Sequence, residues 1–215
     1  MNKLITKFKQ IHDPIHGYIK LSNIACKIVD NYYFQRLRYL HQLGTCFYVF
    51  PSATHSRFEH SLGTYCLTGR ILDSIIKNTD ANYLNECLLQ VDELKNYYQR
   101  TYGDNNNVEY NKLDNYVCEL IKIAGLCHDL GHGPFSHVFD DLFLKLHNEI
   151  TPSKQHETRS GDIIQLIINS DPELSHFFTN DEIKFIKNLI NPIDSSIGFV
   201  YQFLYIDRME NNCKK

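Results

Sequence analysis

The stretch Ile123-Ala-Gly-Leu-Cys-His-Asp-Leu-Gly-His-Gly-Pro-Phe-Ser-His137 decides the expected fold. The apolar run 117–127 predicts a buried helix, and the glycines and proline beyond it predict where that helix ends. His128 and Asp129 therefore fall near a helix end, with two further histidines close behind them. Imidazoles beside a carboxylate suit a divalent metal that activates water. The stretch predicts a helical protein with a metal site at a helix end.

The sequence around this stretch predicts further helices and one short hairpin. Residues 11–21 alternate apolar and polar side chains around Pro14 and Gly17, which favours a turn between two strands. Apolar spacing of three to five residues predicts helices elsewhere. These lie at 23–40 with a break near Asp30, and at 58–77, 135–146, 161–168 and 181–190, the last opened by Thr179 or Asn180. We expect an all-α fold with at most a small N-terminal β-hairpin.

Two apolar clusters are expected in the core. The stripe of the 58–77 helix comprises Phe58, Leu62, Tyr65, Cys66, Ile71, Ile75 and Ile76. The cluster at 47–50 lacks the interleaved basic residues of a base-stacking surface and is also predicted to be buried. We expect a single domain over 1–215, in which 78–116 is a variable insertion and 191–215 a divergent, truncated C-terminus.

Composition argues against several classes of protein. The 215 residues carry 22 Lys and Arg against 25 Asp and Glu, a formal net charge of -3, so no global basic field for nucleic acid is expected. No apolar run approaches the roughly 20 residues of a membrane span. Seven cysteines without a Cys-x-x-Cys pair predict reduced thiols. We expect a soluble intracellular protein, cytoplasmic or nuclear, with no membrane partner and no sequence-specific nucleic acid.

A metal at His128 and Asp129 needs more ligands than these two. A stable mononuclear site that leaves room for water usually takes about two further protein ligands. His60, between Thr54 and Gly63, is one candidate, and Asp207, between Tyr205 and Met209, is another. Such a set of histidines and carboxylates accepts Fe, Mn, Mg, Zn or Ni, so the sequence leaves the identity of the single expected metal open.

Several ordered motifs together resemble one known family. They are Asp13-Pro-Ile-His-Gly17, Phe34-Gln-Arg-Leu-Arg-Tyr39, His55-Ser-Arg-Phe-Glu-His-Ser-Leu-Gly63 and the stretch from Gly125 to His137. They resemble the HD-domain deoxynucleoside triphosphate triphosphohydrolases, most closely the branch that in animals carries a sterile-alpha-motif domain. The resemblance covers residues 9–165 and describes a short chain with the HD domain only, whereas the C-terminal fifty residues match poorly.

The resemblance implies the ligands and the reaction. It implies a metal held by His60, His128, Asp129 and Asp207, and cleavage of dNTPs to deoxynucleoside and triphosphate, as in a dGTPase. Arg208 would bind substrate together with Arg57. One helical turn separates Arg57 from His60, so its guanidinium is expected on the same face, aimed at a phosphate, although an ion pair with Glu59 or another acid is the alternative.

The resemblance also implies two further groups of residues. The catalytic group matches histidines and carboxylates around the scissile phosphate: His132, His137, Asp140, His156 and Glu157. We expect His137 or His156 to protonate the leaving oxygen, with Asp140 available to orient an imidazole. The other group matches an activator site for GTP or dGTP between subunits of a homo-oligomer: Lys9, Asp30, Gln35 and Arg38.

The C-terminus departs from the family pattern. Asn211 replaces a tyrosine that packs on the nucleotide sugar, and Lys215 is where a further sugar-binding aspartate would follow. Turnover that is slow and poorly selective for deoxyribose is therefore expected. Two other functions remain open: a nucleotidase or phosphomonoesterase with the same metal cage, and a nucleotide-binding regulator with little turnover.

Overall fold

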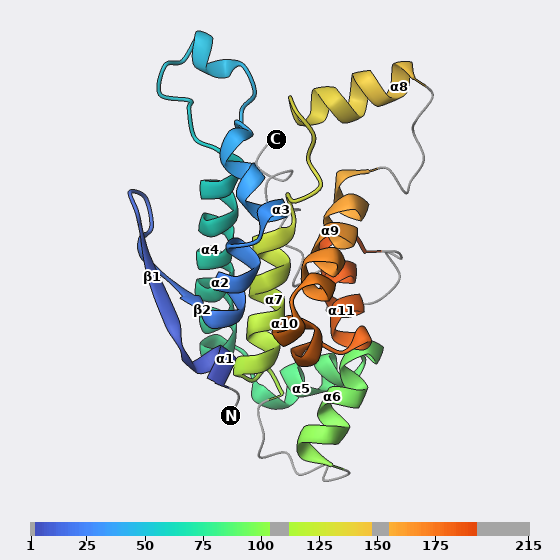
Figure 1. Cartoon of the computed structure of the whole chain (residues 1–215). Coiled ribbons are helices and arrows are strands. Elements are labelled where there is room, and N and C mark those ends of the chain that lie inside the picture. The colour runs from blue at the N-terminus through green and yellow to red at the C-terminus, as the bar shows by residue number, and fades with distance from the viewer. Residues whose placement is uncertain (1–2, 104–111, 148–154, 193–215) are drawn as a thin grey trace.

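The computed structural model describes residues 3–103, 112–147 and 155–192, and within these ranges the chain is mainly helical with one two-stranded antiparallel sheet (Figure 1). The elements are α1 (Lys3–Thr6), β1 (Phe8–Asp13), β2 (Gly17–Ser22), α2 (Asn23–Val29), α3 (Tyr32–Gln35), α4 (Arg57–Asn78), α5 (Ala81–Leu89), α6 (Asp92–Tyr102), α7 (Asn115–Cys127), α8 (Leu144–Leu146), α9 (His156–Ser170), α10 (Pro172–Phe177) and α11 (Asn180–Ile190), with tighter or wider helical turns at Arg36–Tyr39, Cys46–Tyr48 and Phe139–Phe143.

The predicted hairpin is confirmed as β1 and β2. Its register runs from Phe8 opposite Ser22 to Asp13 opposite Gly17. The Asp13 carboxylate accepts hydrogen bonds from the backbone N–H groups of Ile15 and His16, at 2.9 and 2.7 Å. Gly17 has a φ of 72°, a left-handed conformation that glycine adopts more readily than other residues. The turn therefore ends at the glycine from which it was predicted.

Helices α4 and α7 lie side by side at the centre of the fold (Figure 1). Helix α4 buries a stripe composed of Phe58, Leu62, Tyr65 and Leu72. The prediction was wrong for Ile71 and Ile76, whose side chains are 40% and 38% exposed. Ile71 lies off this stripe, because a step of seven residues from Tyr65, two helical turns, leads to Leu72. Cys66 and Ile75 are partly buried against the core.

A buried carboxylate joins the hairpin to the two central helices. Glu119 on α7 accepts hydrogen bonds from the Ser22 hydroxyl at 2.6 Å and the Tyr65 hydroxyl at 2.7 Å. The ammonium of Lys122 lies 2.7 Å from its other oxygen. Because both carboxylate oxygens of Glu119 have partners, its charge can be buried. The same hydrogen bonds fix β2, α4 and α7 relative to one another.

Residues 78–116, predicted to be an insertion between core helices, contain α5 and α6. Leu84 and Leu88 of α5 and Leu94 and Tyr98 of α6 are buried in the same core cluster as α7. Helix α6 also packs on α11. The segment therefore contributes to the core, while the assignment of all 215 residues to one domain stays a prediction, and residues 193–215 lie outside the described ranges.

The helices of the C-terminal half confirm the predictions with shifted bounds. Helix α9 begins five residues before the predicted 161, and α11 begins at Asn180 after Thr179, whose side chain caps it together with Glu182. Helix α10 was not predicted; Asp171 caps it and Pro172 occupies its first turn, both standard start signals in a segment too short to show periodicity.

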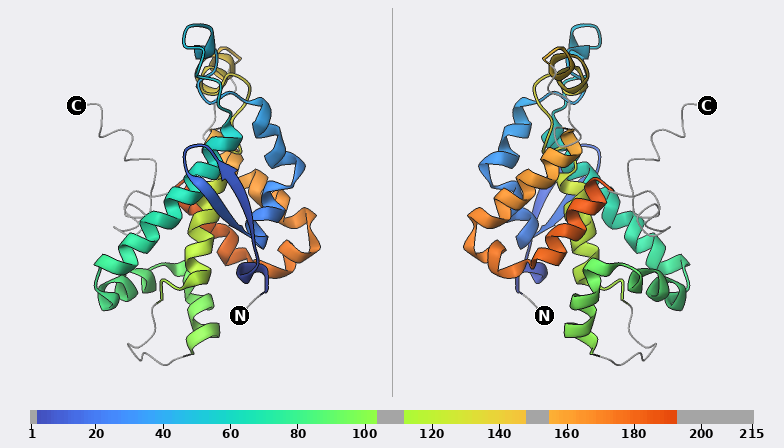
Figure 2. Two further views of the ribbon diagram at one scale, coloured as in Figure 1. Left: turned by 90° about the vertical axis from the view of Figure 1, so that its left-hand side faces the viewer. Right: turned by 90° about the vertical axis from the view of Figure 1, so that its right-hand side faces the viewer.

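The prediction of a helix over 135–146 was wrong at its start. Phe135 and Ser136 have φ values of 62° and 55°, which helices do not allow, so regular turns begin only at Phe139. The 47–50 cluster was also predicted wrongly as core, because Tyr48 and Val49 are 79% and 74% exposed. Both segments lie at one end of the molecule (Figure 2).

In the described ranges, no helix has the length and apolar character that crossing a bilayer requires. The six cysteines within these ranges are free thiols, in agreement with the prediction.

Candidate metal centre

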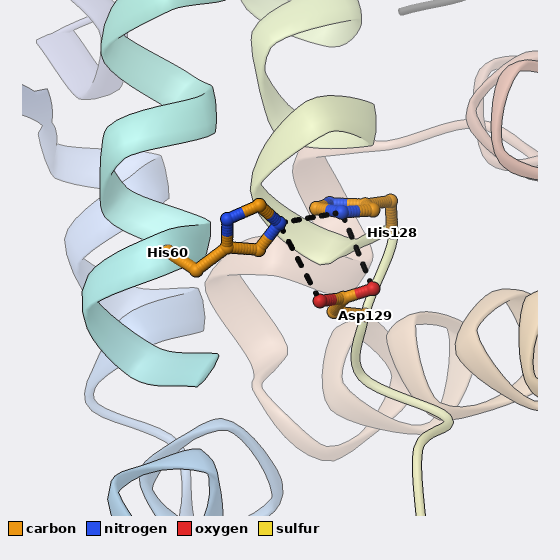
Figure 3. Close-up of side chains that lie close together, drawn as sticks. All are labelled: His60, His128 and Asp129. Atoms are coloured by element: carbon orange, nitrogen blue, oxygen red, sulfur yellow. Dashed lines mark hydrogen bonds and ion pairs between the residues drawn. The ribbon is translucent and has the colours of Figure 1, made fainter. Parts of the chain in front are cut away.

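Three predicted ligands converge where α4 begins and α7 ends (Figure 3). The Nε2 atoms of His60 and His128 lie 3.2 Å apart. The Asp129 carboxylate faces both rings, with Oδ2 3.6 Å from Nε2 of His60 and Oδ1 3.2 Å from Nε2 of His128. Their ligand atoms all lie within 4.8 Å of one another. Two imidazole nitrogens and one carboxylate thus point into the same small volume.

Local sequence fixes the start of α4 close to His60. The Glu59 carboxylate accepts hydrogen bonds from the backbone N–H and the hydroxyl of Ser56, the residue before the helix. This capping box starts the helix at Arg57, so His60 lies in the first turn. Since α4 packs along α7, that turn meets the residues that follow Cys127.

A backbone hydrogen bond sets the tautomer of His128. Its Nδ1 lies 2.7 Å from the carbonyl oxygen of Gly125. A carbonyl can only accept, so Nδ1 carries the proton and Nε2 presents its lone pair to the other two ligands. Metal-binding histidines are commonly oriented in this way, by a backbone acceptor on the opposite nitrogen.

Side chains from distant parts of the chain hold the turn after His128 by its backbone. The hydroxyl of Ser160 donates to the His128 carbonyl at 2.6 Å and accepts from the N–H of Gly131 at 2.7 Å. Arg36 donates to the carbonyls of Leu130 and His132. These contacts fix the ligand-bearing turn against α9 and the segment after α3.

Sequence reasoning missed both of these holding residues. Arg36 lies inside the motif that starts at Phe34, so its position was available, but its role as a donor to carbonyls was not. Ser160 carries no sequence signal. The glycine at position 131 was a partial sequence signal of this close approach. A Cβ there would lie 2.6 Å from the backbone nitrogen of Ser160 and would collide with the His156 carbonyl.

Asp129 is buried and ionised. Burial is the largest single influence and raises its pKa, but His128, the hydrogen bond from His132 and the guanidinium of Arg57 together hold that pKa well below the usual range. Nη1 of Arg57 lies 2.5 Å from Oδ2 of Asp129, and its Nε donates to the Ser136 hydroxyl at 3.1 Å. Arg57 therefore lies on the predicted face, and its acidic partner is Asp129 rather than Glu59.

The residues predicted to be catalytic form a second group beside the first. The rings of His132 and His156 stack with centroids 4.0 Å apart, and the His137 ring meets both edge-on at 5.1 and 5.4 Å. Nδ1 of His156 lies 3.3 Å from Asp140 and its Nε2 lies 3.2 Å from Glu157. Nε2 of His132 lies 3.4 Å from Oδ1 of Asp129, which connects the two groups.

Burial favours the neutral form of His60, His132 and His156. It lowers the pKa of His132 to about 4, outweighing the opposing hydrogen bond to Asp129. It also lowers the pKa of His60 and that of His156. Nδ1 of His132 is buried without a hydrogen-bond partner. Neutral imidazoles are the form that can bind a cation or accept a proton.

The chemistry of the donor set fits a divalent metal. His60, His128 and Asp129 offer two imidazole nitrogens and one carboxylate oxygen, a set typical of transition metals. Such a metal would supply charge stabilisation for a phosphate and activation of water. Asp207 and Arg208 lie outside the described residues, so the fourth ligand and the second substrate arginine stay predictions.

The four predicted activator residues form two pairs. Nζ of Lys9 lies 3.4 Å from the Asp30 carboxylate, and both side chains are exposed. Nε of Arg38 donates to Oε1 of Gln35 at 2.7 Å, and its guanidinium lies 3.5 Å above the ring of Phe58. The charged groups of the first pair are accessible to a ligand, whereas those of the second are already engaged within the chain.

Comparison with known proteins agrees with this geometry. The family model described as "HD domain" matches residues 110–191, which include His128, Asp129 and the histidines behind them. These residues of the chain therefore form an HD domain. His60 precedes the matched range, so the α4 side of the site is identified by structure rather than by that match.

The relatives found extend the match to nearly the whole chain. A putative HD domain-containing protein, L394, of Acanthamoeba polyphaga mimivirus is 42% identical over 190 residues, 88% of this chain and 37% of that protein. The deoxynucleoside triphosphate triphosphohydrolase SAMHD1 is 36% identical in Bos taurus, over 97% of this chain and 31% of that protein, and 36% identical in Homo sapiens, over 90% and 27%. The chain thus spans about a third of the length of these relatives.

Proposed function

We propose that this HD-domain chain is a metal-dependent phosphohydrolase that cleaves dNTPs to deoxynucleoside and triphosphate. The observation that carries the proposal is the convergence of His60, His128 and Asp129 beside a second group of histidines, His132, His137 and His156. The relatives named as deoxynucleoside triphosphate triphosphohydrolases support the choice of substrate. The dGTPase-like preference is part of the proposal.

The residues of this chain divide the chemical work. His60, His128 and Asp129 hold the metal, with Asp207 proposed as the fourth ligand. Arg57 faces the metal ligands with its guanidinium and is suited to bind a phosphate oxygen in addition to Asp129. Arg208 is proposed to bind the substrate from the C-terminal segment.

Proton transfer is assigned to the second group. His137 is more exposed than His132, so it can reach a bound substrate, and His156 is flanked by Asp140 and Glu157. A histidine in either position, once protonated, can donate that proton to the 5′-oxygen as the bond to the α-phosphorus breaks. Asp140 lies on the Nδ1 side of the His156 ring and Glu157 on its Nε2 side.

Metal analysis tests the site. Purified protein should contain about one tightly bound divalent ion per chain, and His60→Ala and His128→Ala should each lose it. His176→Ala is the matched control, because His176 is an exposed histidine at the end of α10. If both ligand variants retain full metal, the site assignment is wrong.

Product analysis tests the reaction and separates the alternatives. Incubation with dGTP followed by anion-exchange chromatography should give deoxyguanosine and triphosphate. Release of orthophosphate instead would support a nucleotidase or phosphomonoesterase with the same cage. Nucleotide binding without turnover in metal-replete protein would support the regulator and contradict the proposed activity.

A further inference from the structure

The first turn of α9 lies directly against the turn that carries the metal ligands. The Ser160 hydroxyl bridges the His128 carbonyl and the Gly131 N–H. A side chain at Gly131 would collide with the carbonyl of His156. His156 therefore sits at a junction where two backbone segments touch, and its ring position depends on what fixes that junction.

Arg159 spans this junction with its guanidinium. Its Nε donates to the Gly131 carbonyl at 2.8 Å, and its Nη2 lies 2.5 Å from Oδ1 of Asp140. The other carboxylate oxygen of Asp140 faces Nδ1 of His156 at 3.3 Å. The Arg159 side chain thus contacts both the ligand-bearing turn and the carboxylate that lies beside the His156 ring.

The segment that carries Asp140 is weakly packed. Leu142 and Phe143 of the same turns are more than half exposed, so little apolar burial holds this segment on the body of the protein. Phe139 provides one anchor, because its ring packs on Gly133 and lies beneath the Arg159 guanidinium at 6.0 Å. The charged hydrogen bond between Arg159 and Asp140 is the other.

We propose that Arg159 is a positioning residue for His156, acting through Asp140. This inference rests on the proposed function of His156 in proton transfer. By fixing the Asp140 carboxylate relative to the turn at Gly131, Arg159 keeps that carboxylate beside Nδ1 of His156, while Glu157 lies on the Nε2 side of the ring. The planar fork of an arginine suits this task because it donates in two directions at once, which a lysine ammonium on a flexible stem does with less geometric control.

The structure predicts a specific kinetic effect. Arg159→Ala should lower kcat by about 10- to 100-fold, the usual effect of removing a residue that orients a functional side chain. KM should change little, because Arg159 is engaged with Gly131 and Asp140 rather than with substrate. Guanidinium chloride at low concentration should restore part of the lost turnover, and Arg159→Lys should retain more activity than Arg159→Ala.

An experiment independent of turnover tests the same point. Nitrogen NMR of protein labelled at its histidine rings distinguishes the two neutral tautomers. In the wild type His156 should give one set of ring-nitrogen signals, and both Arg159→Ala and Asp140→Asn should shift or broaden these signals while the metal content stays unchanged. Arg100→Ala is the matched control, since it removes another guanidinium–carboxylate pair, with Glu182 at 2.8 Å, between α6 and α11.

The outcomes separate the two proposals. An unchanged His156 ring spectrum in Arg159→Ala, or equal effects of Arg159→Ala and Arg100→Ala on kcat, would overturn the positioning role. If wild-type protein turns over no nucleotide but the ring spectrum changes as described, the proposed function fails and the coupling from Arg159 to His156 still holds. If Arg159→Ala does not fold, the same comparison is made with Arg159→Lys and Asp140→Asn.

Discussion

The guanidinium of Arg57 and the carboxylate of Asp129 form an ion pair whose side chains are only 3% and 6% exposed. The pair links the first turn of α4 to the turn after α7, across the same carboxylate that faces His60 and His128. Asp129 is therefore both a proposed metal ligand and the counter-ion of a buried arginine. Its replacement is expected to affect stability and metal binding separately.

Asp129→Asn should destabilise the protein even without metal. The substitution leaves the Arg57 charge buried without its anion, which typically costs about 3–5 kcal/mol. Urea denaturation with a chelator present measures this loss. Asp92→Asn, at an exposed pair with Lys95, should change the free energy of unfolding far less.

A double variant provides the stricter comparison. Replacing Arg57 and Asp129 together by Met and Leu removes both charges, so it should recover much of the stability that Asp129→Asn loses. If the double variant is as unstable as the sum of its single variants, the pair is not coupled as the structure describes.

The pH dependence of stability should reflect the buried histidines. The pKa of His132 falls from an ordinary value of about 6.5 to about 4. Between these values the unfolded chain binds a proton that the native protein does not, so the free energy of unfolding decreases as pH falls through this window. The contribution of His132 is up to about 3 kcal/mol. The lowered pKa values of His60 and His156 act in the same direction.

Denaturation of metal-free protein at pH 7 and pH 4.5 measures this slope. His132→Gln should flatten it, and His176→Gln, at an exposed position, should leave it unchanged. Asp129 affects stability at lower pH. Because its pKa is depressed, its contribution to the free energy of unfolding is complete above the ordinary pKa of about 3.9 and is lost as the pH falls below that value. An equal slope in His132→Gln and wild type would show that His132 is not the group responsible.

Two glycines should respond in opposite ways to alanine. At Gly131 a Cβ would meet backbone atoms of α9, so Gly131→Ala should displace α9 from the turn and cost about 1–3 kcal/mol or more. At Gly69, inside α4, a Cβ would lie 3.7 Å from the Lys122 side chain, an ordinary contact. Gly69→Ala should therefore gain up to about 1 kcal/mol from helix propensity. Thermal denaturation of both variants tests these two expectations. A higher melting temperature for Gly131→Ala would contradict the close approach of α9 to Gly131.

The sequence predicted the helices that carry the ligands because each has its own local signals. The apolar run before His128 and the apolar spacing over 58–77 act within a few helical turns, so they can be recognised without knowing the fold. The contact between His60 and His128 could not be derived from spacing, since 68 residues separate them. The family resemblance supplied that pairing.

The wrong predictions concern features that depend on tertiary packing rather than on local sequence. Ile71 and Tyr48 are apolar residues in plausible patterns, but Ile71 lies beside the buried stripe, which continues at Leu72, and Tyr48 lies in an exposed turn. The turn at Phe135 and Ser136 adopts a left-handed conformation that neither residue type signals. The side chains that hold the ligand turn, Ser160 and Arg36, act on backbone carbonyls far away in sequence, and such contacts leave no local pattern.

The proposed activator site leads to a prediction about assembly. Lys9 and Asp30 form an exposed pair, with side chains each 66% exposed, so a ligand or a second subunit can reach both. A carboxylate can read a guanine edge, and an ammonium can hold phosphates. GTP or dGTP at millimolar concentration should therefore raise the oligomer fraction, measured as mass by light scattering. The double variant Lys9→Ala with Asp30→Ala should lose this response while keeping its melting temperature and metal content. Lys145→Ala with Asp141→Ala is the matched control, because it removes another exposed pair. No change in mass for the wild type with nucleotide would show that this chain does not assemble in response to it.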